Sequence, residues 1–127
     1  MPVEVIRGEG LAESHLPFSP AIKAGGFVFV SGQASVGADG QIVKDTFEGE
    51  FRRSMENVKT ILAGGGLTLK DVVRVTSYLT DPKDLAEYNT LYKEYFEKPY
   101  PARTTLTNCL PADLIKFEVD VVAYAEG

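Results

Sequence analysis

The sequence predicts an α+β fold in which two helices pack against one face of a mixed β-sheet. Residues 47–62 and 85–96 carry apolar side chains at spacings of three and four, which is typical of amphipathic helices. Residues 72–79 are rich in β-branched side chains and indicate a central strand. The predicted elements follow the order strands, helix, strand, helix, strand and strand. This order favours one sheet with both helices on the same side.

The uncovered face of this sheet predicts self-association. One layer of helices covers only one face of a sheet, and the other face would still carry apolar side chains. We therefore expect that face to be buried against other subunits.

Length and composition predict a single domain spanning residues 1–127. Hydrophobic residues make up 44% of the chain and charged residues 24%, which is ordinary for a globular protein with one core. The net charge of −5 and the scattered basic residues argue against a nucleic-acid partner. No apolar run approaches the roughly 20 residues of a membrane span, and residues 1–5 lack the features of a signal peptide. We therefore expect a cytoplasmic protein with no membrane partner.

The chain contains one cysteine, Cys109, and one histidine, His15. A single cysteine forms no intrachain disulfide, and we interpret Cys109 as a half-buried thiol in preference to a catalytic nucleophile. A zinc site would need carboxylates for most of its ligands, and a Ser-His-Asp triad would depend on His15. The sequence therefore predicts no metal site.

The N-terminal part predicts two short strands around an irregular segment. Residues 3–7 alternate weakly and indicate a first strand. The stiff loop at residues 17–20 presents Phe18, and capping the core is the commoner role of such a ring. Residues 27–30 form an apolar run that predicts a buried strand. Gly32 is expected to end this strand and to let the backbone approach whatever lies opposite.

The first helix has recognisable start and stop signals. Asp45 is the predicted N-cap, and Glu48 three residues later resembles a capping box. Three glycines at residues 64–66 end the helix. Its apolar stripe consists of Phe47, Phe51, Met55, Val58, Ile61 and Leu62.

The second helix begins at Asp81 and Pro82, a cap followed by proline at the first helical position. Its stripe, which we interpret as core, consists of Leu85, Tyr88, Tyr92, Tyr95 and Phe96. Asn89 lies beside this stripe, either as a solvated residue or as a polar contact at the edge of a pocket.

The C-terminal part predicts two strands, at residues 103–108 and 115–124. If a hairpin turns about residues 110–111, antiparallel partners have numbers that sum to about 221, which places Arg103 opposite Glu118. The connection is long enough for this register to slip.

Arg103 follows prolines at positions 99 and 101, which hold the backbone at the mouth of its strand. A guanidinium fixed in this way binds a carboxylate through two parallel hydrogen bonds, and Glu118 would hold or activate a water. The alternatives are a solvated or surface-paired Arg103 and a cross-strand ion pair made by Glu118. Asp120 faces the same side of the strand as Glu118, and either carboxylate could serve.

Four features together resemble the RidA/YjgF family of imine deaminases. They are Pro-Ala-Arg at residues 101–103, Ser-Gly-Gln at residues 31–33, the distance from Arg103 to Glu118, and the order of the elements. The similarity covers about residues 17–124. It implies a chorismate-mutase-like α+β domain that forms a homotrimer with active sites at the subunit clefts. It also implies hydrolysis of 2-imino acids and their enamine tautomers to 2-oxo acids and ammonia, with no metal and no cofactor.

The resemblance also implies roles for particular residues. Arg103 matches the family arginine that binds the substrate carboxylate, and Glu118 matches the glutamate that positions the hydrolytic water. The implied substrate-binding set consists of Phe18, Ser31, Gly32, Gln33, Asn89 and Thr105.

Two of these positions depart from the family pattern. Phe18, followed by Ser19 and Pro20, occupies the place of a tyrosine, so a hydroxyl that could touch the substrate is missing. Thr105 occupies the place of a cysteine that many members carry. These changes leave the carboxylate-binding arginine intact and bear on the substrate range.

We therefore expect a cytoplasmic homotrimeric deaminase that acts on 2-iminopropanoate and 2-iminobutanoate. Within the family, 3-aminoacrylate and 2-aminomuconate are alternative substrates. A non-catalytic protein that binds small carboxylates and an endoribonuclease or translation inhibitor are alternatives of other classes. The acidic net charge counts against RNA binding.

Overall fold

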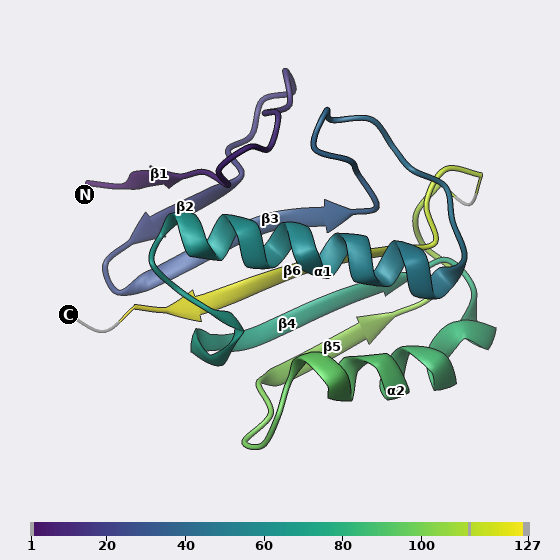
Figure 1. The fold of residues 1–127 in the computed structure, drawn as a ribbon. Helices are drawn as coiled ribbons and strands as arrows, with labels where there is room; N and C mark the ends of the chain where they lie inside the picture. The colour runs from purple at the N-terminus through teal and green to yellow at the C-terminus, as the bar shows by residue number, and fades with distance from the viewer. Residues whose placement is uncertain (1, 112, 126–127) are drawn as a thin grey trace.

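Six β-strands form one mixed sheet, and two α-helices pack across one of its faces (Figure 1). The computed structural model describes residues 2–111 and 113–125. The strands lie in the order β1-β2-β3-β6-β4-β5. They are β1 (Glu4–Ile6), β2 (Ala21–Ala24), β3 (Phe27–Ala34), β4 (Val72–Leu79), β5 (Ala102–Leu106) and β6 (Phe117–Tyr124). The helices are α1 (Phe47–Gly64) and α2 (Leu85–Tyr95), with short 3-10 turns at Leu69–Asp71 and Pro82–Asp84.

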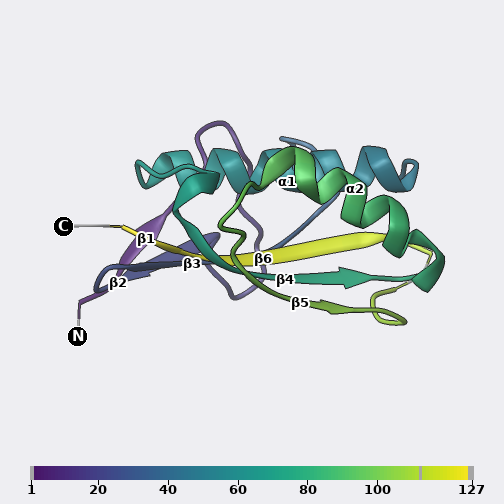
Figure 2. The same ribbon diagram turned by 90° about the horizontal axis from the view of Figure 1, so that it is seen from below.

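The predicted α+β architecture is confirmed. Seen along the sheet, both helices lie on one side, and no helix among the described residues covers the other side (Figure 2). The helical stripes and the strand at Val72–Leu79 also appear as predicted.

The core lies between the sheet and the helices. Along β6, Phe117 and Val119 are buried because alternate residues of the strand point toward the helices. Phe51 of α1 is fully buried, and its ring centroid lies 4.8 Å from that of Phe117 and 6.0 Å from that of Tyr88 on α2. One aromatic cluster thereby joins both helices to the centre of the sheet, and burial of each ring contributes about 1.5–3 kcal/mol.

Helix α1 is capped by Thr46, so the prediction of Asp45 as N-cap was wrong. The Thr46 hydroxyl accepts a hydrogen bond at 3.1 Å from a backbone N–H in the first turn. The Asp45 carboxylate is engaged elsewhere, because it accepts hydrogen bonds from the N–H of Thr46 and from the Arg53 guanidinium. Glu48 pairs with Arg52 along the helix, which leaves the expected capping box unformed.

Strand β3 was predicted to be a buried run that stops at Gly32, and both parts of that prediction were wrong. The strand continues through Gly32 to Ala34, and it forms a hairpin with β2, a strand that the sequence reasoning missed. Phe27 and Phe29 are 43% and 49% exposed, while Val28 between them is buried. The apolar run is therefore two-faced, because successive side chains of a strand point to opposite sides of the sheet.

The predicted hairpin between the last two strands does not form. β5 pairs in parallel with β4, with Arg103 beside Val75, and β6 is inserted between β3 and β4. Helix α2 connects β4 to β5, and a helical crossover of this kind joins parallel neighbours. Glu118 therefore lies beside Tyr78 of β4 and Ala34 of β3, and Arg103 is not its partner.

The face of the sheet without helices carries exposed apolar side chains. Phe29, Leu106 and Tyr124 are all exposed, and the ring of Phe27 packs against that of Tyr124 at 5.2 Å. A patch of this kind is typical of protein interfaces. We call the face of the sheet without helices the open face. None of the described helices is long and apolar enough to cross a membrane.

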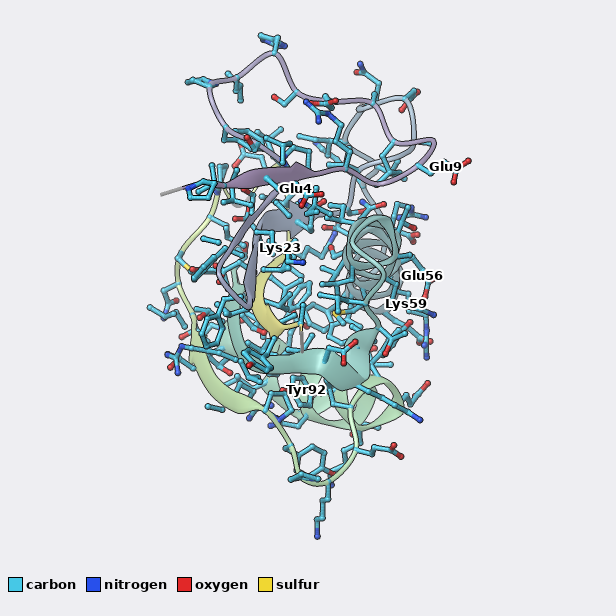
Figure 3. All side chains as sticks on the ribbon, turned by 90° about the vertical axis from the view of Figure 1, so that its left-hand side faces the viewer. Glu4, Glu9, Lys23, Glu56, Lys59 and Tyr92 are labelled. Carbon is cyan, nitrogen blue, oxygen red and sulfur yellow. The ribbon has the colours of Figure 1, made fainter. Side chains whose placement is uncertain are left out.

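Replacing Phe51 by alanine should lower the free energy of unfolding by about 3–5 kcal/mol, because the cavity would open where both helices meet the sheet. The control is Lys59→Ala on the outer side of α1, where Lys59 forms a surface pair with Glu56 at 3.4 Å (Figure 3). That change should stay within about 0.5 kcal/mol. Urea denaturation measures both variants, and equal losses would contradict this description of the core.

Candidate active site

Arg103 lies on the edge strand β5 and points toward the helices. Its neighbour Val75 is fully buried beneath them, and paired residues of adjacent strands share a face. The guanidinium carbon of Arg103 lies 5.0 Å from the ring centroid of Tyr88 and 4.8 Å from that of Tyr92. Cation–π contacts of this kind contribute about 0.5–2 kcal/mol each. We call Tyr88 and Tyr92 the tyrosine platform, because they hold the guanidinium in place.

The tyrosine platform is itself fixed by hydrogen bonds and packing. The hydroxyl of Tyr88 donates to Ser77 Oγ at 2.7 Å, and Thr105 Oγ1 donates to the Tyr88 hydroxyl at 3.4 Å. The ring of Tyr92 packs on that of Phe96 at 4.6 Å. Thr105, predicted to bind substrate, thus lies on the same side of β5 as Arg103. Its hydroxyl contacts Tyr88, the tyrosine on which the Arg103 guanidinium packs.

Arg103 opens into a pocket of about 510 Å³ beside α2. The lining residues are Asn89, Tyr92, Lys93, Tyr100, Pro101 and Arg103. The structure therefore brings together two of the predicted site residues, Asn89 and Arg103. Within the part of the chain that the structure describes, no carboxylate forms an ion pair with Arg103. A guanidinium that is held by aromatic rings and has no acidic partner is well suited to bind an anion.

Glu118 belongs to the opposite face of the sheet. Its neighbours Phe117 and Val119 are buried against the helices, so its own side chain points to the open face. It lies across Gly32 of β3, where a Cβ atom would collide with the Glu118 carboxylate. Glycine at this position is therefore what allows the close approach.

The two carboxylates on this part of β6 differ in their surroundings. Asp120 accepts a hydrogen bond from the Tyr78 hydroxyl at 2.7 Å, and this bond, together with burial, raises the pKa of Tyr78 to about 12. Burial, and then the charge of Asp120, raise the pKa of Glu118. Glu118 is therefore the carboxylate better suited to take up a proton, and the Asp120 carboxylate is engaged by the Tyr78 hydroxyl.

The N-terminal loop and β3 form a second cavity of about 480 Å³, which Phe18, Gly32 and Gln33 help to line. Phe18 is 51% exposed and does not cap the core. The Ser31 hydroxyl donates to the Ser19 carbonyl at 2.6 Å, and Gln33 Nε2 donates to the Ser31 carbonyl at 3.1 Å. The first bond holds the loop against β3, and the second lies within the strand. Of these predicted residues, Gly32 is the one that approaches Glu118.

The predicted site residues thus fall into two groups that do not meet within one chain. Arg103 pairs with Val75, which pairs with Val121, three residues along β6 from Glu118. With about 4.8 Å between strands and about 3.3 Å per residue, the Cα atoms of Arg103 and Glu118 are about 14 Å apart. Their side chains also point to opposite faces of the sheet.

Sequence reasoning missed Tyr88, Tyr92 and Lys93 as residues of the site. The two tyrosines were interpreted as core, and both are indeed buried. For Tyr88 the available signal was chemical, because a buried tyrosine needs a partner for its hydroxyl and a phenylalanine does not, and here that partner is Ser77. Lys93 follows Asn89 by four residues, which places both on the same side of α2.

The family described as Endoribonuclease L-PSP matches residues 11–125. The chain belongs to this family, the RidA/YjgF family. A RutC family protein of Pyrococcus horikoshii is 41% identical to it over 97% of this chain and 98% of the relative. TdcF of Escherichia coli, provisionally named a reactive intermediate deaminase, is 35% identical over 84% of this chain and 85% of its own.

Solved structures of RidA/YjgF proteins share the fold. The crystal structure of yeast Mmf1 matches with a TM-score of 0.89 and 29% identity, covering 98% of this chain and all of that one. The crystal structure of E. coli TdcF with bound serine matches with a TM-score of 0.84 and 31% identity, covering 97% and 99% of the two chains. This RidA/YjgF chain therefore has a close structural relative that binds a small amino acid.

Glu118→Gln should raise the melting temperature at pH 7. The pKa of Glu118 is raised in the folded chain, so the folded state favours the protonated carboxyl group. The contribution of this group to the stability of the fold is fully present below the unfolded pKa of about 4.3 and is lost as the pH rises through the folded pKa. Glutamine mimics the protonated form, so the difference in melting temperature between variant and wild type should be small below pH 4, grow as the pH rises through the folded pKa and then level off. Glu9→Gln, at an exposed turn, is the control. A variant less stable than wild type at pH 7 would contradict the proposed environment of Glu118.

Proposed function

We propose that this protein hydrolyses 2-imino acids, including 2-iminopropanoate and 2-iminobutanoate, and their enamine tautomers to 2-oxo acids and ammonia. The observation that carries the proposal is the Arg103 guanidinium, held over the tyrosine platform in a pocket with no acidic residue among its described lining residues. The provisional name of TdcF as a reactive intermediate deaminase, and the serine bound in its crystal structure, support a small amino-acid-like substrate.

In this proposal the site lies at a cleft between subunits of a homotrimer. Arg103 and Glu118 point to opposite faces of one sheet, so they can act on one small molecule only if a neighbouring subunit supplies one of them. The open face offers the apolar surface that such a neighbour would cover, and covering it would bring the Glu118 side of one chain toward another chain.

The proposed reaction needs only the substrate, water and two positioned groups. Arg103 binds the carboxylate next to the imine carbon, and Glu118 holds a water and takes its proton as the oxygen attacks that carbon. Glu118 passes that proton to the nitrogen of the resulting carbinolamine and then takes the proton of its hydroxyl group as the C–N bond breaks. Ammonia leaves as the carbonyl of the 2-oxo acid forms, and it takes up the last proton as ammonium. Imine and ketone carbons have the same oxidation state, so no electrons are transferred.

We place this activity in the cytoplasm. The single cysteine, Cys109, is free and suits a reducing compartment. The description of the family as an endoribonuclease does not lead us to propose RNA cleavage, because a net charge of −5 disfavours phosphate binding.

Arg103→Ala should lower kcat/KM for imines that carry a carboxylate by at least about 100-fold, because the substrate loses the group that orients it. An amino-acid oxidase generates the imine from alanine, and semicarbazide traps whatever the enzyme leaves. Arg52→Ala is the control, since Arg52 contacts Glu48, Glu94 and Tyr95 and none of the pocket residues. Full activity of Arg103→Ala would rule out the proposed carboxylate site.

Phe29→Asp should weaken the proposed trimer, because it introduces a charge into the apolar open face. Light scattering should give a mass near that of one chain for the variant and near three chains for wild type. Ala86→Asp, at an exposed position in the first turn of α2, should leave assembly unchanged. A Phe29→Asp variant with the same mass as wild type would contradict the use of this face as the interface.

A further inference from the structure

Lys93 gives the Arg103 pocket a second cation. Both side chains line the same pocket of about 510 Å³, and neither Asp nor Glu is among the lining residues. Within residues 2–111 and 113–125, neither cation forms an ion pair. Glu94, the acidic residue next to Lys93, forms an ion pair with Arg52 of α1 at 3.0 Å instead of pairing with Lys93.

Two unpaired cations around one pocket are unusual in a chain with 18 acidic and 13 basic residues. Like charges that share a pocket repel each other, and this arrangement becomes favourable when an anion binds between them. One carboxylate is enough for Arg103, because a guanidinium binds both oxygens of a single carboxylate. Lys93 is therefore available for a second anionic group.

Part of the pocket wall is aromatic. Tyr92 is buried and Tyr100 is 43% exposed, with 6.4 Å between their ring centroids, and Pro101 adjoins them. A short carbon chain would pack against these rings while its two ends reach the charges. The lysine ammonium is a point charge at the end of a flexible side chain. It can therefore reach the second anionic group of ligands whose carbon chains differ in length.

On the basis of the proposed function, we infer that the preferred substrate is a 2-imino acid that carries a second carboxylate. Arg103 takes the carboxylate beside the imine carbon, and Lys93 takes the distal one. Asn89, one helical turn before Lys93, lies on the same side of α2 and lines the same pocket.

The test compares the imines that amino-acid oxidases generate from aspartate and from alanine. Wild type should show a kcat/KM at least about tenfold higher for the dicarboxylic imine, and Lys93→Gln should remove that preference by lowering kcat/KM for the dicarboxylic imine at least about tenfold more than for the alanine imine. Lys44→Gln makes the same charge change at an exposed loop position outside the pocket and should alter neither value. Equal losses on both imines in Lys93→Gln, or no loss on either, would overturn the inference.

A binding measurement separates this inference from the proposed function. If wild type hydrolyses neither imine, the proposed deaminase activity fails, and calorimetry with 2-oxoglutarate and 2-oxobutanoate then decides the inference alone. Tighter binding of 2-oxoglutarate that Lys93→Gln abolishes would support a dicarboxylate site. Equal affinity for the two acids, or no binding of either, would overturn it.

Discussion

The alternation of side chains along β6 is the constraint on which the rest of the arrangement depends. Phe117 and Val119 must face the helices to complete the core, and this turns Glu118 to the open face of the sheet. The crossover through α2 has the opposite effect on β5, because it directs Arg103 onto the tyrosine platform beneath the helices. The packing of the core thus places Arg103 and Glu118 on opposite faces of the sheet. In the proposed mechanism, assembly of the trimer brings Arg103 of one subunit close to Glu118 of another.

A buried carboxylate holds the Glu118 strand in place. Glu50 of α1 is only 1% exposed, and its oxygens accept hydrogen bonds from the backbone N–H groups of Asp45 and Lys116 and from the Lys116 ammonium. This network ties the start of β6 to the first turn of α1, two residues before Glu118. Glu50 and Glu118 therefore have different roles. Glu50 is fully satisfied and stabilises the fold, while Glu118 has a raised pKa that costs stability and suits proton transfer.

The sequence predicted the features whose signals are local and missed those set by distant pairing. Both helices followed from their apolar periodicity, and β4 from its β-branched run. Strand β2 is four residues long and contains Lys23, so no pattern revealed it. The position of β5 depends on the crossover through α2, which a hairpin register cannot anticipate. Arg103 and Glu118 could be singled out by family resemblance, but their location on opposite faces follows only from the order of the strands.

Complementation between two inactive chains tests the shared site most directly. Arg103→Ala and Glu118→Gln chains are purified separately, dissociated, mixed in equal amounts and reassembled, with wild type treated in the same way as the reference. If neighbouring subunits supply the two residues, random assembly restores about a quarter of wild-type activity on 2-iminopropanoate, because one site of each mixed trimer is intact. Each variant reassembled alone stays inactive. A mixture as inactive as its components would place both residues in the same subunit's site and contradict the account.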